Sequence, residues 1–131
     1  AGVGMIPLIR KFYHDCKIGF IGLKRDEHIL KPTTYFINLP KKMDSDDVFI
    51  LDPMLATGGS IIKTVELLEG YNVKPRAVIS IISAPEGIKA VKSKYPYLDI
   101  YTASVDEKLN ENGFIVPGLG DAGDRLFGTE E

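Results

Sequence analysis

Residues 48–68, VFILDPMLATGGSIIKTVELL, decide the fold because they join a strand pattern directly to a helix pattern. The run VFIL at 48–51 is short, apolar and continuous, as in a strand that is buried on both faces. After the glycines, four apolar side chains recur on one face of a helix: Ile61, Ile62, Val65 and Leu68. Gly70 is placed to end that helix. A buried strand followed by an amphipathic helix is the repeating unit of an α/β domain.

The segment between this strand and this helix carries two adjacent glycines, Gly58 and Gly59. Both can take positive φ, so the backbone can curl and direct several N–H groups at one anion in front of the helix. Thr57 and Ser60 add hydroxyl donors. A phosphate site is one interpretation of TGGS, and a plain glycine turn with Ser60 as N-cap is an equally good one. The segment is neither a Walker loop, since no Lys-Ser or Lys-Thr pair follows, nor a Gly-x-Gly-x-x-Gly motif.

The rest of the chain continues the alternation of strands and helices. IGFIGL at 18–23 has the pattern of a strand buried on both faces, and AVISIIS at 77–83 and LDIYTAS at 98–104 predict further strands. Helical spacing is found at 5–13 and between Ile88 and Tyr95. The polar stretch 24–32 predicts a mobile loop, and TTYFINL at 33–39 predicts an extended β-arm. We therefore expect one α/β domain, 1–131, with a parallel twisted sheet flanked by helices.

Two aspartates stand where such a sheet would bind a ligand, beyond the carboxyl ends of its strands. Asp52 ends the strand at 48–51, and Asp121 lies in the glycine-rich tail 112–131, whose composition favours a binding loop over a regular element. Both acids could therefore face one crevice. Asp52 could accept hydrogen bonds from sugar hydroxyls, or it could form a turn with Pro53, and the sequence supports the two interpretations equally.

The composition limits the classes of partner. The 131 residues are 44% hydrophobic and 26% charged, with a formal net charge of −2, which gives no electrostatic reason to expect nucleic acid or a membrane as partner. No apolar stretch has the roughly twenty residues of a membrane span. The single cysteine, Cys16, cannot form an internal disulfide, so we expect a reducing, cytoplasmic location.

Two long motifs resemble a known family. VFILDPMLATGGS closely resembles the phosphoribosyl-diphosphate binding signature of the type I phosphoribosyltransferases, in the Asp-Pro variant of uracil phosphoribosyltransferase. GFIVPGLGDAGDRLFGT is similar to that family's uracil-binding segment, and APEGI and DIYTASVDEKLNENG match it in order. The chain resembles the C-terminal two-thirds of the usual family chain. The resemblance implies the phosphoribosyltransferase type I fold with a C-terminal base-binding loop.

The resemblance also implies a reaction, in which uracil and 5-phospho-α-D-ribose 1-diphosphate give UMP and diphosphate in pyrimidine salvage. Mg²⁺ would be carried by the diphosphate, with no metal bound directly by the protein. The implied catalytic residues are Asp52, Arg25 and Asp121. The implied contacts to the diphosphate sugar are Arg25, Asp52, Pro53, Met54, Leu55, Ala56, Thr57, Gly58, Gly59, Ser60 and Asp121. Uracil would be bound by Phe114, Ile115, Gly120, Asp121 and Ala122, mainly through backbone groups that discriminate uracil from cytosine.

The chain also departs from the family pattern. The family has a diphosphate-binding arginine immediately before the Ala-Gly matched by Ala1 and Gly2, and this sequence starts after it, as though its N-terminal part were missing. Asp124 and Arg125 are expected to form a structural ion pair. GTP as an activator and a homodimer or homotetramer of the full-length form are further expectations from the family. The alternative function is a non-catalytic or regulatory nucleotide-binding domain on the same fold, and the net charge argues against its RNA-binding form.

Overall fold

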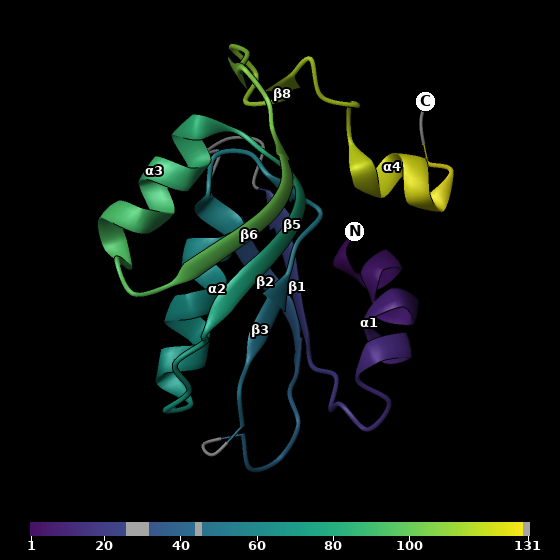
Figure 1. Ribbon diagram of the computed structural model, residues 1–131, viewed down its shortest axis with the longest axis vertical. Helices are drawn as coiled ribbons and strands as arrows, with labels where there is room; N and C mark the ends of the chain where they lie inside the picture. The colour runs from purple at the N-terminus through teal and green to yellow at the C-terminus, as the bar shows by residue number, and fades with distance from the viewer. Residues whose placement is uncertain (26–31, 44–45, 130–131) are drawn as a thin grey trace.

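The computed structural model describes residues 1–25, 32–43 and 46–129, with Arg25 described for its backbone only (Figure 1). The predicted mobile loop lies mostly outside the described residues. In chain order the elements are η1 (Gly2–Met5), α1 (Ile6–Phe12), β1 (Phe20–Arg25), β2 (Pro32–Asn38), β3 (Phe49–Leu51), β4 (Met54–Leu55), α2 (Gly59–Gly70), β5 (Ala77–Ser83), α3 (Pro85–Lys94), β6 (Asp99–Val105), β7 (Lys108–Leu109), β8 (Ile115–Val116) and α4 (Ala122–Phe127).

The main sheet is parallel and has β5 at its centre. β3 and β4 pair with successive parts of one edge of β5, and β6 pairs with the other edge. Between β3 and β4 the chain stays attached to β5, because Asp52 N–H donates to the Ile79 carbonyl (3.2 Å) and the Pro53 carbonyl accepts from Ile82 N–H (3.0 Å). The two short strands therefore act as one strand interrupted at Asp52–Pro53. The prediction of an α/β domain with a parallel sheet is confirmed.

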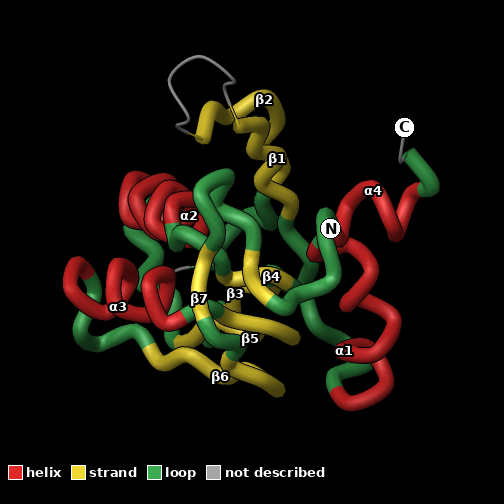
Figure 2. Tube along the Cα trace, turned by 90° about the horizontal axis from the view of Figure 1, so that it is seen from above, coloured by secondary structure: helices red, strands yellow, loops and turns green. Residues whose placement is uncertain are grey.

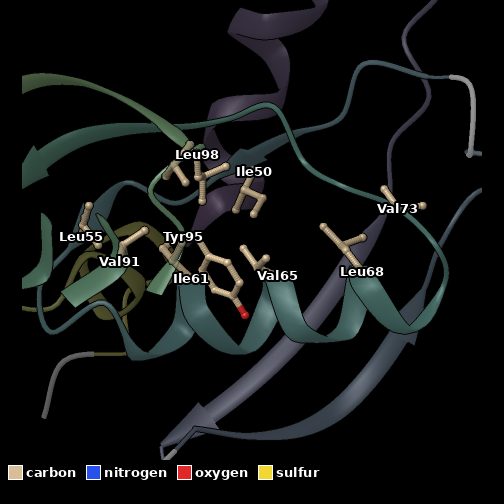
Figure 3. Close-up of a cluster of buried hydrophobic side chains, with 10 residues drawn as sticks. Ile50, Leu55, Ile61, Val65, Leu68, Val73, Val91, Tyr95 and Leu98 are labelled. Atoms are coloured by element: carbon tan, nitrogen blue, oxygen red, sulfur yellow. The ribbon is translucent and has the colours of Figure 1, made fainter. Parts of the chain in front are cut away.

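Helices α2 and α3 cover one face of this sheet, whereas α1 and α4 lie on the opposite side (Figures 1 and 2). The core lies under α2 and α3, where Val65, Val78, Val91 and Leu98 have no exposed surface. Figure 3 shows how α2 directs its apolar stripe toward the sheet. Ten buried residues make up this cluster: Ile50, Leu55, Ile61, Val65, Leu68, Val73, Val78, Val91, Tyr95 and Leu98. The apolar stripe predicted at 61–68 thus anchors the helix that follows the glycines.

The apolar run at 18–23 was expected to form a doubly buried strand, and this prediction is wrong. Within the described residues β1 pairs with β2 alone, in an antiparallel hairpin separate from the main sheet. Ile21 packs against the core, but Phe20 and Tyr35 are exposed. An antiparallel strand pair can leave one face in contact with solvent, and its sequence then usually alternates apolar and polar residues. In this hairpin several exposed side chains are themselves apolar, so the sequence shows no such alternation. The extended arm predicted at 33–39 is confirmed as β2.

The tail also contains more regular structure than its composition predicted. β7 and β8 form a short antiparallel pair, and α4 follows it. Asp121 caps α4, since its Oδ1 accepts from Asp124 N–H (2.9 Å), and Gly128 ends it with φ 66°. An aspartate N-cap and a C-terminal glycine are helix signals that were present in the sequence. No helix in the described parts of the chain is long and apolar enough to cross a membrane.

Candidate phosphate and base site

The loop before α2 has the conformation that its two glycines make possible. Gly58 is the N-cap of α2 and has φ 84°, in the left-handed region. A Cβ there would lie 3.0 Å from the Gly87 carbonyl oxygen and 3.1 Å from Val91 Cγ2, so both the φ and the space require glycine. A Cβ on Gly59 would make only ordinary contacts, the shortest being 3.6 Å to Thr57 Oγ1. The two glycines therefore have different roles.

Helix α3 holds this loop from behind. Its first turn brings Gly87 so close that a Cβ there would lie 2.1 Å from the Ala56 carbonyl oxygen. Ala84 N–H donates to the Leu55 carbonyl (2.9 Å), which joins the start of α3 to the end of β4. Gly87 is a part of the site that the sequence did not predict. Its only signal was a glycine inside a helical pattern, which often marks close packing.

Asp52 stands at the interruption between β3 and β4. Its Oδ1 accepts a hydrogen bond from Met54 N–H (3.2 Å), so the turn interpretation is confirmed. Burial raises the pKa of this carboxyl above its ordinary value, and the Met54 N–H bond and the α-amino group of Ala1 partly oppose that rise. No group in the described parts of the chain donates a hydrogen bond to Oδ2. One oxygen therefore fixes the turn and the other is available to a ligand.

A cavity of about 340 Å³ lies between the loop before α2, the β1–β2 hairpin and the tail. A smaller cavity of about 50 Å³ adjoins it and is bordered by Asp52. The large cavity is lined by Leu23, Lys24, Pro32, Met54, Ala56, Thr57, Gly59, Ser60, Gly113, Phe114, Ile115, Gly120, Asp121 and Ala122. Met54, Ala56, Thr57 and Ser60 line both cavities. Asp52 and Asp121 therefore border neighbouring cavities that share one wall.

The loop and the tail, which are more than fifty residues apart in the sequence, thus meet at one cavity. The large cavity is lined by all five residues that were expected to bind the base. Phe114 is 42% exposed there, whereas Ile115 is only 3% exposed, so its backbone is the part of Ile115 that suits ligand contact. Asp121 lines the same cavity, and its Oδ1 caps α4. This is the size of space that holds a small organic ligand.

Some predicted site residues do not face this space. Pro53 lines neither cavity and is buried, and Leu55 belongs to the core with 1% exposure, although its backbone borders the smaller cavity. The side chain of Arg25 lies outside the described residues. The ion pair expected between Asp124 and Arg125 is wrong: Arg125 Nη1 donates to the Leu119 carbonyl (3.0 Å), and Asp124 accepts from the Thr129 hydroxyl (2.7 Å).

Four further residues line the large cavity and were not predicted from the sequence: Leu23, Lys24, Pro32 and Gly113. Three of them belong to the β1–β2 hairpin, whose place beside α2 depends on the tertiary fold. Pro32 lies near the glycine loop, since a Cβ on Gly59 would be 3.7 Å from Pro32 Cδ. Lys24 brings a cation to the cavity edge. Among the described residues, no three His, Cys, Asp or Glu side chains are grouped as a metal ion would require.

The site combines three chemical functions. The start of α2 offers backbone N–H groups and the hydroxyls of Thr57 and Ser60, a donor set for a phosphate. The Asp52 carboxylate can accept hydrogen bonds from sugar hydroxyls. The tail offers backbone donors and acceptors with an aromatic ring beside them, which suits a planar heterocycle. Such a set fits a ligand that contains a phosphate, a sugar and a base.

Comparison with known proteins gives a consistent result. The profile of the family described as uracil phosphoribosyltransferase matches residues 1–129. Three relatives are named uracil phosphoribosyltransferase, and their alignments cover 99% of this chain. The sequence identity is 54% for the protein from Clostridium botulinum (strain Eklund 17B), 53% for the one from Pediococcus pentosaceus and 51% for the one from Ureaplasma parvum. The chain spans only 62–63% of the length of these relatives.

A solved structure is similar as well. The AQ2163 protein from Aquifex aeolicus is 38% identical and superposes with a TM-score of 0.91, covering 97% of this chain and 61% of its own. A similarity of this extent confirms the predicted fold. The family resemblance inferred from the two motifs is confirmed by the family profile.

Proposed function

The chain belongs to the uracil phosphoribosyltransferase family, and we propose that it carries the site that transfers the 5-phosphoribosyl group from 5-phospho-α-D-ribose 1-diphosphate to uracil. N1 of uracil forms a bond to C1 of the ribose, the bond from C1 to the diphosphate breaks, and the N1 proton is released. The products are UMP and diphosphate. The observation that carries this proposal is the single cavity shared by the glycine loop and the tail.

The 5′-phosphate is assigned to the loop before α2. Gly58 with φ 84° turns the backbone into the helix, and Gly59 leaves the space in front of it free of a side chain. Thr57 and Ser60 supply hydroxyls, and both line the cavity. The dipole at a helix N-terminus adds about 0.3–1 kcal/mol for each negative charge at an exposed site.

The ribose is assigned to Asp52, which lines the smaller cavity while its Oδ1 holds the turn. This carboxylate would fix the sugar hydroxyls so that C1 faces the base. In glycosyl transfer of this kind positive charge develops on the sugar ring, so catalysis depends on positioning and on neutralising the departing diphosphate.

The base is assigned to Phe114, Ile115, Gly120 and Ala122, all of which line the cavity. Backbone groups are fixed in place, and cytosine would leave some of them unpaired because its amino group replaces a carbonyl of uracil. A buried polar group without its partner costs about 1–3 kcal/mol, which is why such a site can reject the wrong base. The exposed ring of Phe114 would cover the plane of the base.

The diphosphate would arrive as its Mg²⁺ complex. Asp121, at the cavity wall, suits contact with the Mg²⁺–diphosphate, directly or through water. Cations are needed there as well to stabilise the leaving group. Arg25, which pairs with Pro32 in the β1–β2 hairpin, and Lys24, which lines the cavity, are our candidates for these cations.

Binding of the product tests this assignment without turnover. UMP contains the phosphate, sugar and base that the three parts of the site would bind, and calorimetry should detect its binding by the 131-residue chain. CMP should bind at least about tenfold more weakly, as expected for one unpaired buried group. Gly59→Ala should weaken UMP binding because its methyl group would enter the cavity wall. Gly70→Ala is the matched control, since a Cβ on Gly70 meets nothing within 4 Å. Equal binding of UMP and CMP would contradict the proposal.

A further inference from the structure

The segment assigned to the base is held by a residue that does not line either cavity, Asp106. Asp106 directly follows β6, and its N–H donates to the Ser83 carbonyl (2.9 Å) at the end of β5. Its backbone therefore continues the pairing of the main sheet by one residue. The side chain of Asp106 starts from a fixed point at the carboxyl edge of the sheet.

Both oxygens of the Asp106 carboxylate accept hydrogen bonds. Oδ2 accepts from Gly118 N–H (2.9 Å), across twelve residues of the chain. Oδ1 accepts from the Ser104 hydroxyl (3.2 Å), which fixes the orientation of the carboxylate. The partly buried bond to Gly118 joins the sheet to the tail, and bonds to a charged acceptor are stronger than bonds between neutral groups.

Gly118 lies at the point where the tail turns back on itself. It has φ 53°, and a Cβ there would lie only 2.1 Å from the Ile115 carbonyl oxygen. The turn from Ile115 to Gly118 is therefore tight. Ile115 at its start is held by pairing with Leu109, and Asp106 holds Gly118 at its end. Gly120 and Ala122, which line the cavity, follow within four residues.

From these contacts we propose that Asp106 is a positioning residue for base recognition. It holds the Ile115–Gly118 turn at the carboxyl edge of the sheet, so that the backbone groups of the tail meet the base in a fixed geometry. This inference rests on the proposed function for the identity of the base. Asp106 acts on affinity for uracil, and the phosphate loop is attached to α3 and β5 independently of it.

Three variants test this role: Asp106→Ala, Asp106→Asn and Glu107→Ala. Alanine removes the acceptor, asparagine keeps an acceptor oxygen in the same place, and Glu107 is the neighbouring exposed carboxylate as control. For each, the KM for uracil and the KM for the diphosphate sugar are measured separately, and amide hydrogen exchange is followed at residues 113–120 and in β5.

We expect Asp106→Ala to raise the KM for uracil about tenfold, as for loss of one bond to a charged group. The KM for the diphosphate sugar should stay within about twofold, and protection should fall at residues 113–120 but not in β5. Asp106→Asn should retain most of the wild-type behaviour, and Glu107→Ala should match the wild type.

An unchanged KM for uracil in Asp106→Ala, an equal rise of both KM values, or unfolding of the whole domain would overturn the positioning role. If the wild-type chain forms no UMP, the proposed function fails, and hydrogen exchange then decides the positioning role alone. In that case unchanged protection at residues 113–120 in Asp106→Ala overturns it.

Discussion

Replacing each of the two adjacent glycines by alanine should affect different properties of the protein. Gly58→Ala places a Cβ on a residue with φ 84°, and a side chain in the left-handed region costs about 1–2 kcal/mol. The new methyl group would also press on the Gly87 carbonyl at 3.0 Å and on Val91 Cγ2 at 3.1 Å. Overpacking of this kind costs about 1–3 kcal/mol. We therefore expect Gly58→Ala to lower the free energy of unfolding by about 2–4 kcal/mol.

Gly59→Ala has neither cost, since its Cβ would make contacts of 3.6 Å and longer. Its free energy of unfolding should stay within about 0.5 kcal/mol of the wild type, while UMP binding weakens. Gly70→Ala should stabilise by about 0.5–1 kcal/mol, because a helical glycine with open space around it gains from alanine's propensity.

Urea unfolding followed by far-UV circular dichroism measures all three variants. With a slope of about 1–3 kcal/mol per molar urea, the Gly58→Ala midpoint should fall by about 1–2 M. If the midpoint of Gly58→Ala lies within about 0.3 M of the midpoint of Gly59→Ala, the left-handed N-cap and its contact with α3 do not contribute to the free energy of unfolding.

Three further predictions follow from particular contacts. Burial raises the pKa of Asp52, so ionisation of this carboxyl lowers the folding stability as the pH rises from the ordinary pKa of 3.8 to the raised pKa. At pH 7, Asp52→Asn should therefore melt at a higher temperature than the wild type while losing UMP formation. An unchanged melting temperature would refute the predicted direction of this stability change. Gly87→Ala should destabilise by about 1–3 kcal/mol despite its helical position, because its Cβ would lie 2.1 Å from a backbone oxygen, and urea midpoints compared with Gly70→Ala measure this. Ser80 Oγ is buried and has no hydrogen-bond partner among the described residues, whereas Ser83 Oγ donates to the Thr102 hydroxyl (2.9 Å). Ser80→Ala should therefore stabilise and Ser83→Ala should destabilise, each by about 1 kcal/mol. Thermal melts that shift in the same direction for both variants would contradict this.

The stretch 48–68 allowed most of the fold and half of the site to be predicted. Its strand, turn and helix are set by local rules, so the left-handed φ of Gly58 and the buried face of α2 agree with the prediction. The other two strands of the main sheet, β5 and β6, were predicted from single uninterrupted sequence segments. The local pattern was sufficient for α2 because its apolar side chains recur on one face, where Ile61, Val65 and Leu68 are buried.

The errors come from contacts that no local pattern encodes. The run at 18–23 looked doubly buried, but β1 lies in a hairpin where Phe20 and Tyr35 remain exposed. In the sequence Gly87 is only a residue of low helix propensity. The structure shows that the Ala56 carbonyl oxygen lies too close to leave room for a Cβ there. The tail looked irregular because it is rich in glycine and contains Pro117, although Asp121 and Gly128 do bound a helix. Lys24 and Pro32 line the large cavity only because the β1–β2 hairpin packs beside α2 in the tertiary fold.

The attachment of α3 explains how the short loop before α2 keeps its conformation. Gly87 supports Ala56 from behind, and Ala84 N–H ties the start of α3 to Leu55 (2.9 Å). The loop is therefore fixed before any ligand arrives, which lowers the entropy that binding must overcome. Sites held in this way by rigid elements keep their geometry during catalysis.

Conversion of labelled uracil to UMP by the 131-residue chain, with 5-phospho-α-D-ribose 1-diphosphate and Mg²⁺, tests the central claim most directly. Cytosine in place of uracil and the Asp52→Asn variant are the controls. We expect UMP from uracil, no CMP from cytosine, and loss of UMP in Asp52→Asn. Products from both bases alike, full activity in Asp52→Asn, or no UMP from a chain that is folded would contradict it.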